Sequence, residues 1–244
     1  MADGRTLTSS TQTSSLVPDP GPPRCIASGV RRLERAQARS SNSRLTPYPS
    51  SLVTGVILAG GQGRRMGSVD KGLQPLRGKP MVAWVIERFA PQVDEVLINA
   101  NQNLERYAAL GHRVIPDEIA GYAGPLAGLH RGLTEAAHEL VATAPCDSPF
   151  LPRDLIARLR AALELQAAEI AVAKTGDQPH PVFCLCRRGV LPGLTAFLAG
   201  GGRKIDAWYA KLKVVEVAFD DNPGAFSNVN TEAELKAFEE RPLQ

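Results

Sequence analysis

A glycine-rich segment with nearby basic residues is the first part of this chain where residue types and spacing indicate chemistry. It follows an apolar run, 53–58, and contains Gly60, Gly61, Gly63, Arg64, Arg65 and Lys71. Glycine lets backbone N–H groups approach an anion closely, and basic side chains neutralise phosphate charge. We therefore expect the segment to bind a triphosphate. A flexible, solvated basic loop is the alternative.

The segment differs from the two best-known phosphate-binding loops. A P-loop has Gly-Lys-Ser/Thr immediately before a helix, whereas Lys71 lies between Asp70 and Gly72. A dinucleotide-binding fingerprint opens a helix directly on its glycines, whereas the next helical pattern here begins only at Pro80. We therefore exclude both loops and expect a long, polar and basic connection.

A carboxylate follows a second apolar run, 140–144, within the motif PCDSP at 145–149. The two prolines constrain the turn, and Asp147 then lies at the carboxyl end of a predicted strand. Magnesium commonly takes one or two protein carboxylates together with phosphate oxygens and water. We therefore assign Asp147 as a Mg²⁺ ligand. The alternative is that Asp147 only caps the following helix.

Polar side chains also end two further apolar runs. Asn99 ends the run 93–99, and Asp117 follows the run 113–115. Carboxyl ends of parallel strands meet at one edge of a sheet, so we expect both side chains to face a base or a ribose there. A role in a turn fits their spacing equally well. Asn228 and Asn230 are candidates for binding a substrate phosphate or a metal, or for shaping a turn.

Apolar and β-branched runs alternate with amphipathic stretches from residue 53 onward. The predicted strands are 53–58, 93–99, 113–115, 140–144, 169–174, 182–186 and 214–218. The predicted helices are 80–89, 104–110, 125–138, 152–166, 190–198, 204–211 and 231–239. This alternation predicts an α/β fold with a doubly wound, mainly parallel sheet and helices on both faces. Ligands of such a sheet bind beyond the carboxyl ends of its strands.

The net charge of +3 over 244 residues comes from the first fifty residues. They hold seven arginines against three acidic residues, which leaves 21 basic and 22 acidic residues in 51–244. They also hold nine of the thirteen serines and four closely spaced prolines, a composition typical of disorder. We predict a disordered Ser/Pro/Arg-rich N-terminal extension at 1–50 and a single folded domain at 51–244. We expect the extension to be a solvated segment, or to result from a start codon assigned too far upstream. The alternative is a targeting peptide.

Two cysteines, Cys184 and Cys186, lie two residues apart within a predicted strand. No second pair accompanies them at zinc-site spacing, so we expect buried strand residues rather than a metal site. No apolar run reaches the roughly 18 residues needed to span a bilayer. We expect a cytoplasmic monomer without a nucleic-acid or membrane partner.

The glycine-rich segment resembles the nucleotidyltransferases that begin with such a loop. The matching motifs are LAGG at 58–61, RMG at 65–67, DK at 70–71 and GKP at 78–80. Over about residues 53–240 the chain is similar to the molybdenum cofactor guanylyltransferases. The motifs that carry this similarity are DKGL at 70–73, NAN at 99–101, GPLAG at 124–128, PCDSP at 145–149, HP at 180–181 and NVNT at 228–231.

The resemblance implies a single nucleotidyltransferase domain with a Rossmann-like fold. It also implies transfer of GMP from GTP to the terminal phosphate of molybdopterin carrying molybdenum (Mo-molybdopterin), which yields the molybdopterin guanine dinucleotide cofactor and pyrophosphate with Mg²⁺ as the required metal. Molybdenum-insertion proteins and apo-molybdoenzymes are candidate further partners. The extension at 1–50 departs from the family, whose members start shortly before the first strand.

The resemblance also implies roles for individual residues. The nucleotide contacts are Leu58, Ala59, Gly60, Gly61, Lys71, Asn99, Asp117 and Asp147. Catalytic roles fall to Arg65, Lys71 and Asp147, with Asp147 also the Mg²⁺ ligand. His180, Asn228 and Asn230 are assigned to the pterin substrate. Two rivals remain: a sister transferase that uses CTP or another NTP on a pterin, sugar or isoprenoid phosphate, and a GTP-binding delivery module without transfer activity.

Overall fold

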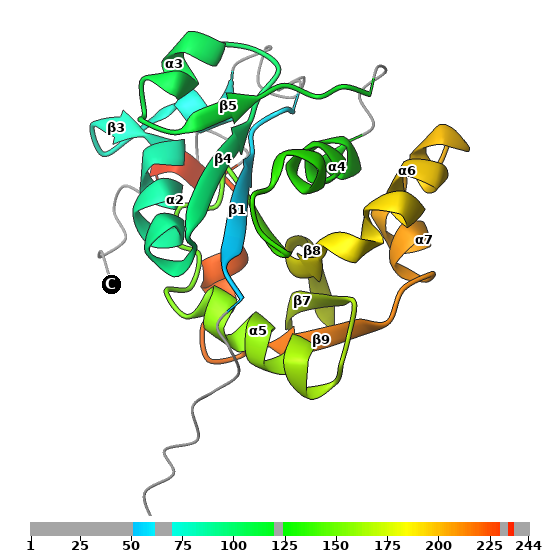
Figure 1. Ribbon diagram of the computed structural model, residues 1–244. Coiled ribbons are helices and arrows are strands. Elements are labelled where there is room, and N and C mark those ends of the chain that lie inside the picture. The colour runs from blue at the N-terminus through cyan, green and yellow to red at the C-terminus, as the bar shows by residue number, and fades with distance from the viewer. Residues whose placement is uncertain (1–50, 62–69, 120–123, 230–233, 237–244) are drawn as a thin grey trace, which may run out of the picture. The chain divides into compact units, whose positions relative to one another are not determined.

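A seven-stranded sheet is the centre of the folded part of the chain. The structure is a computed structural model that describes residues 51–61, 70–119, 124–229 and 234–236. The strand order is β5-β4-β1-β6-β8-β7-β9. The strands are β1 (Val53–Leu58), β4 (Glu95–Asn99), β5 (Arg113–Ile115), β6 (Leu140–Pro145), β7 (Ile170–Thr175), β8 (Gln178–Arg187) and β9 (Val214–Ala218). Figure 1 shows their arrangement with the helices around them.

Strand β8 runs antiparallel to its neighbours β6 and β7, and the remaining pairs in the sheet are parallel. The predicted mainly parallel α/β sheet is therefore confirmed. β8 begins four residues earlier than the predicted strand at 182, because a tight turn at Gly176 (φ 53°) pairs it with β7. The extra residues include Pro179 and Pro181, which cannot donate to a ladder. A register shift between Val172 and Ala173 accommodates them.

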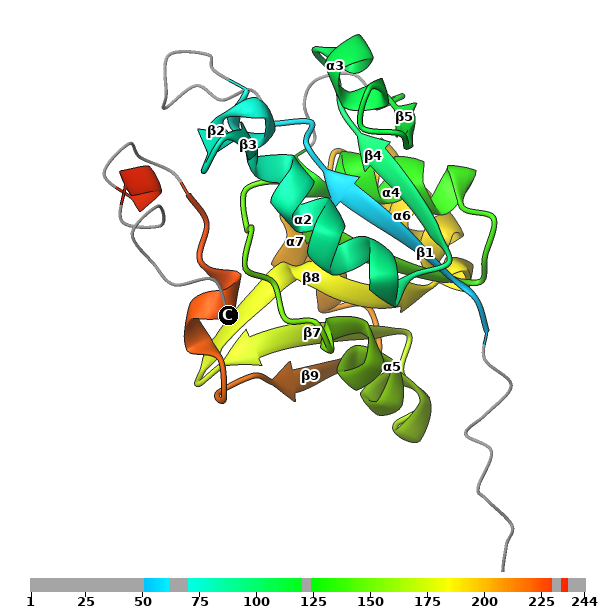
Figure 2. The ribbon, with the colours of Figure 1, turned by 90° about the vertical axis from the view of Figure 1, so that its left-hand side faces the viewer.

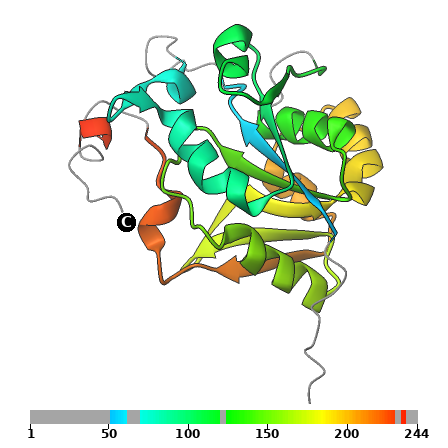
Figure 3. The same cartoon turned by 60° about the vertical axis from the view of Figure 1, so that its left-hand side comes forward.

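Helices cover both faces of the sheet, as predicted. They are α2 (Met81–Phe89), α3 (Leu104–Ala108), α4 (Pro125–Glu135), α5 (Leu155–Leu165), α6 (Leu191–Ala199) and α7 (Ile205–Tyr209). α2 and α5 lie on one face, and α4, α6 and α7 lie on the other (Figures 2 and 3). A small hairpin of β2 (Pro75–Leu76) and β3 (Lys79–Pro80) was not predicted. Four short 3₁₀ helices were not predicted either: η2 (Lys71–Leu73), η3 (Ala90–Gln92), η4 (Arg188–Val190) and η5 (Pro223–Phe226).

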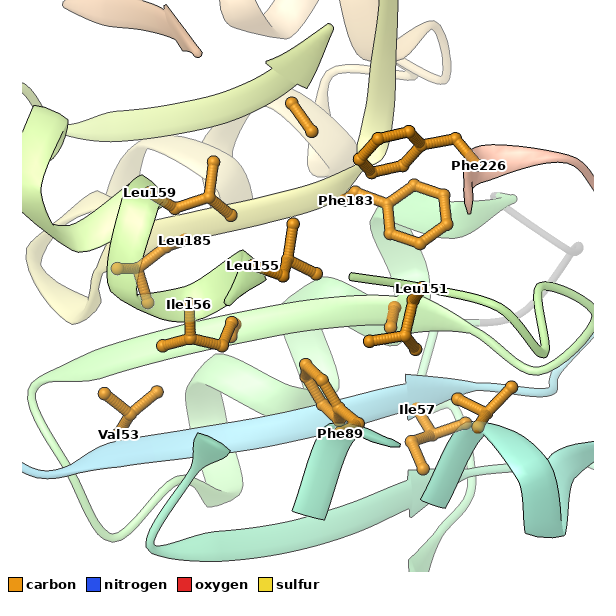
Figure 4. Close-up of a cluster of buried hydrophobic side chains, with 14 of the residues drawn as sticks. Val53, Ile57, Phe89, Leu151, Leu155, Ile156, Leu159, Phe183, Leu185 and Phe226 are labelled. Atoms are coloured by element: carbon orange, nitrogen blue, oxygen red, sulfur yellow. The ribbon is translucent and has the colours of Figure 1, made fainter. Parts of the chain in front are cut away.

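The core on the α2 and α5 face explains why these amphipathic stretches form helices there. Phe89 of α2 and Leu155 of α5 are fully buried between the helices and the strands (Figure 4). Gly55 in the middle of β1 makes room for Phe89, since a β-carbon at residue 55 would lie 2.6 Å from its ring. Fully burying a side chain of this size contributes roughly 1.5–3 kcal/mol. These contacts fix the strands that carry the polar residues described below.

Several expectations concern features away from the sheet edge. Cys184 and Cys186 are buried, free cysteines on one face of β8, as predicted. Among the described residues, none of the helices combines the length and apolar character that a membrane crossing needs. Residues 50–244 form one compact unit. The predicted extension at 1–50 lies outside the described residues, as does most of the predicted helix at 231–239, so both stay predictions.

Candidate active site

The carboxyl ends of four neighbouring strands bring the predicted polar residues to one edge of the sheet. β1, β4, β5 and β6 run in the same direction. Ala59 N donates to Asn99 O at 2.7 Å, so the chain leaving β1 stays paired with β4. Cys146 N donates to Leu58 O at 3.1 Å on the other side. The first residues of the glycine-rich segment therefore lie between the ends of β4 and β6.

Three side chains at this edge form a closed hydrogen-bond network, which we call the Asp117 cluster (Asn99, Asn101 and Asp117). Asn99 Nδ2 donates to Asp117 Oδ1 at 2.8 Å, and Asn101 Nδ2 donates to Asp117 Oδ2 at 2.7 Å. Asp117 N donates back to Asn101 Oδ1 at 2.8 Å. Both oxygens of one carboxylate thus accept an amide hydrogen. This holds Asp117 in one orientation at the edge of the sheet.

Two glycines allow the Asp117 cluster to pack against its neighbours. A β-carbon on Gly60 would lie 2.9 Å from Asn101 Nδ2, and one on Gly128 would lie 2.3 Å from Asn99 Oδ1. Asn101 Nδ2 also reaches Gly60 O at 3.3 Å. The absence of a side chain at Gly60 and Gly128 is therefore a requirement of this arrangement. Gly61 is exposed beside it.

Lys71 and Asp147 form an ion pair at the end of β6, next to the glycine-rich segment. Lys71 Nζ lies 3.6 Å from Asp147 Oδ2, and the side chains are 22% and 14% exposed. Lys71 begins η2, and Asp147 follows β6 in the turn that the PCDSP motif predicts. Burial raises the pKa of Asp147, while Lys71 acts in the opposite direction. The ionised form of Asp147 therefore depends on positive charge nearby.

The donor set around Asp147 is compatible with magnesium. In the described part of the chain, no three His, Cys, Asp or Glu side chains gather to form a protein-only metal cage. Magnesium does not require such a cage, because phosphate oxygens and water complete its coordination. A buried carboxylate whose charge is disfavoured by its surroundings gains from a cation. Asp147 is the described residue that fits this role.

His180 and Asn228 reach the same end of the sheet from its other half. β8 is antiparallel, so its first residues lie beside the last residues of β7 (Figure 2). His180 Nε2 pairs there with Thr175 Oγ1 at 2.8 Å. The His180 ring stacks on Phe226 with centroids 4.6 Å apart. Burial lowers the pKa of His180, which favours the neutral ring.

Asn228 is tied directly to the Asp147 turn. Ser148 Oγ donates to Asn228 Oδ1 at 2.6 Å, and Val229 N donates to Asp147 O at 3.0 Å. The segment after η5 therefore lies against the turn that carries Asp147. Arg65 and Asn230 lie outside the described residues, so their predicted roles stay predictions.

Sequence reasoning missed some members of this site. Asn101 and Ser148 belong to the NAN and PCDSP motifs, but neither was assigned a role. The signal that could have indicated Asn101 is its place in the sequence, two residues after Asn99. Tyr107, whose hydroxyl bonds the carboxylate of Asp70, reads in sequence as an apolar residue of a short helix. Nothing local to residue 107 indicates that bond.

Comparisons with known proteins agree with this geometry. Residues 55–214 match the family model of the MobA-like NTP transferase domain. A molybdenum cofactor guanylyltransferase of Cupriavidus taiwanensis is 52% identical over 194 residues, covering 78% of this chain and 97% of that protein. One of Burkholderia ambifaria is 51% identical over 206 residues, covering 81% of this chain and 100% of that protein.

Solved structures show the same fold. Molybdopterin-guanine dinucleotide biosynthesis protein A from Archaeoglobus fulgidus has a TM-score of 0.65 at 26% identity, covering 77% of this chain and 97% of that one. A 4-diphosphocytidyl-2C-methyl-D-erythritol synthase from Anaerococcus prevotii has a TM-score of 0.59 at 12% identity, covering 78% and 95%, and indicates the fold alone. Family model, relatives and fold agree with the motifs at the sheet edge, and this chain belongs to the molybdenum cofactor guanylyltransferase family of MobA-like NTP transferases.

Proposed function

We propose that the protein transfers GMP from GTP to the terminal phosphate of molybdopterin, or Mo-molybdopterin, and releases pyrophosphate. The observation that carries the choice of substrates is the 52% identity over 97% of a molybdenum cofactor guanylyltransferase. The chemistry is supported by the site, because a buried carboxylate, a lysine and a rigid polar cluster meet at the edge of the sheet where the glycine-rich segment begins.

The nucleoside binds at the Asp117 cluster and the adjoining backbone. Asn99 and Asn101 hold the carboxylate of Asp117 in a fixed orientation, which suits hydrogen-bond donors of a base or a ribose. Leu58, Ala59 and Gly60 supply backbone groups between β4 and β6. Because the donors and acceptors are already held in place, little ordering remains to be done on binding.

The triphosphate binds between Gly61 and the Lys71–Asp147 pair. The Lys71 ammonium would neutralise phosphate charge, the backbone amides of the glycine-rich segment would donate hydrogen bonds to phosphate oxygens, and Asp147 would hold the magnesium ion. When bound, Mg²⁺ neutralises phosphate oxygens in the transferring group. The cation also favours the ionised form of Asp147, whose pKa burial raises in the free protein.

The reaction is an in-line displacement at phosphorus. An oxygen of the terminal phosphate of molybdopterin forms a bond to the α-phosphorus of GTP. The bond from that phosphorus to the oxygen bridging to the β-phosphate breaks, and pyrophosphate leaves with its electrons. Lys71, together with Arg65, stabilises charge on the leaving group. No protein nucleophile is needed, and Cys146 is unsuited to be one, since burial raises its pKa well above the usual value.

The acceptor binds on the side of His180, Asn228 and Asn230. His180 is held by Thr175 and Phe226, and Asn228 is held by Ser148. The bond from Ser148 to Asn228, beside Asp147, supports an acceptor site next to the phosphate end. We further propose that the protein acts as a cytoplasmic monomer and passes its product to proteins of molybdenum insertion or to apo-molybdoenzymes.

The deciding experiment measures pyrophosphate release by the purified protein with molybdopterin, Mg²⁺ and each of the four NTPs in turn. We expect release with GTP, dependence on molybdopterin, and a product whose mass equals molybdopterin plus GMP. A protein carrying Asp147→Asn serves as the matched control for contaminating activity. Preferred release with CTP would identify a sister transferase. GTP binding without any pyrophosphate release would identify a delivery module.

A further inference from the structure

The carboxylate of Asp70, which directly precedes Lys71, is hydrogen-bonded to the segment that contains α3. Tyr107 Oη donates to Asp70 Oδ1 at 2.6 Å, and Asn103 Nδ2 donates to Asp70 Oδ2 at 3.0 Å. Tyr107 lies within α3, and Asn103 is the N-cap of that helix, in the left-handed region at φ 51°. Each oxygen of Asp70 therefore already accepts a hydrogen bond. This occupancy sets Asp70 apart from Asp147.

The Tyr107 hydroxyl lies where the chain segments that carry Lys71 and Asp147 meet. Tyr107 is fully buried. A β-carbon on Gly72 would lie 2.6 Å from Tyr107 Oη and 3.1 Å from Cys146 Sγ. Gly72 follows Lys71 in the chain, and Cys146 precedes Asp147. One hydroxyl is thus packed close to the immediate neighbours of both members of the ion pair.

The Tyr107 hydroxyl is protonated at neutral pH and can donate to Asp70. Burial raises the pKa of Tyr107, and the nearby Cys146 and Asp70 act in the same direction. The hydroxyl therefore stays protonated and remains a donor. Around Asp70 the backbone is also fixed, since Leu73 N donates to Asp70 O at 3.2 Å in η2.

We propose that Tyr107, together with Asn103, is a positioning residue that aligns Lys71 with Asp147 by holding Asp70. The inference rests on the proposed function only in taking GTP as the ligand that Lys71 meets. It assigns Asp70 a structural role through Tyr107 and Asn103 rather than a place among the metal ligands. The rival reading is a buried hydrogen bond that stabilises the fold without acting on Lys71.

A double-mutant cycle separates these readings. Equilibrium GTP affinity in the presence of Mg²⁺ is measured for the wild type, Tyr107→Phe, Lys71→Ala and the double variant. We expect Tyr107→Phe alone to weaken GTP binding by about fivefold to tenfold, the net contribution of one ordinary hydrogen bond. In the Lys71→Ala background the same change should weaken binding less than twofold, about the limit of additivity error for independent sites. A positioning role that acts through Lys71 vanishes when Lys71 is removed.

Thr54→Val is the matched control. Thr54 Oγ1 donates to Glu95 Oε2 at 2.6 Å and Thr54 is fully buried, so the deleted bond is also hydroxyl to carboxylate. It lies at the start of β1, away from the site end of that strand. We expect Thr54→Val to lower the melting temperature without changing GTP affinity.

Three results would overturn the inference: unchanged GTP affinity in Tyr107→Phe, equal losses in both backgrounds, or an equal loss in Thr54→Val. If Tyr107→Phe does not fold, the cycle is run with Asn103→Gly, because glycine accepts the φ of 51° while deleting the other bond to Asp70. Pyrophosphate release by the wild type tests the proposed function separately. If the wild type releases no pyrophosphate, the proposed function fails, but the GTP affinities of the cycle still test the role of Tyr107.

Discussion

The two polar regions at the edge of the sheet, the Asp117 cluster and the Lys71–Asp147 pair, differ in how fully the oxygens of the carboxylate are hydrogen-bonded. In the Asp117 cluster, both carboxylate oxygens accept amide hydrogens at 2.7 and 2.8 Å. In the Lys71–Asp147 pair, the charged atoms are 3.6 Å apart, beyond ordinary hydrogen-bond distance. Burial raises the pKa of Asp147, whereas the Asp117 carboxylate is held by neutral amides.

This difference indicates which part of the ligand each region binds. A satisfied network is rigid and presents fixed groups, which suits recognition of a nucleoside. A buried carboxylate with a raised pKa is an electrostatic cost that a bound cation offsets. We infer that the nucleoside end of the site is preformed, while the phosphate end is completed by the ligand and its metal. The predictions below test this contrast.

Asp147→Asn should cause the largest loss. The amide keeps the size of the side chain but removes the charge that we propose for metal binding, so kcat/KM for GTP should fall by about 1,000-fold. Asp154→Asn is the control, because Asp154 also forms a 3.6 Å ion pair, with Arg158, at the surface of α5. Its rate should match that of the wild type. Wild-type turnover by Asp147→Asn would show that the phosphate end does not depend on this carboxylate.

Gly128→Ala and Gly132→Ala test the preformed end. Both glycines lie on α4, but a β-carbon at 128 would meet Asn99 Oδ1 at 2.3 Å, whereas one at 132 would meet Val56 at 2.6 Å. We expect both variants to lose stability, and only Gly128→Ala to weaken GTP binding, by about tenfold. Melting temperatures and titration calorimetry measure the two effects. Equal GTP affinities in the two variants would contradict a rigid Asp117 cluster.

The smallest expected effect concerns stability and pH. Because the folded state raises the pKa of Asp147, its ionised form disfavours folding, and this cost disappears as the carboxyl is protonated at lower pH. With a chelator present, Asp147→Asn should gain melting temperature relative to the wild type near pH 7. That gain should shrink as the pH is lowered toward about 4, near the unfolded pKa of aspartate. A difference that is constant with pH would refute the burial cost of Asp147.

Three strands have the bounds that the sequence predicted. They are β1, β5 and β9, and each is a short run with β-branched residues, which favour strands. The first residues of β8 were missed because Pro179 and Pro181 argue against a strand. There the pairing with β7 and the turn at Gly176 override the local preference.

For the site, sequence reasoning predicted the residues at strand ends but not their partners. Asn99, Asp117 and Asp147 follow apolar runs, and parallel topology brings such positions together. The bonds from Asn101 to Asp117 and from Tyr107 to Asp70 join residues 16 and 37 positions apart. Their pairing depends on how α3 and the loops pack, which periodicity does not encode.

The reversed direction of β8 has a consequence for how this enzyme family can diversify. Every described residue assigned to the nucleotide comes from residues 58–147, while His180 and Asn228 come from the chain after Pro149. Under the proposed assignment, donor and acceptor selectivity are encoded in separate, consecutive stretches, which are joined near the site by the bonds of the Asp147 turn to Asn228 and Val229. Acceptor preference can change by substitutions in the second stretch while the nucleotide contacts of the first remain intact.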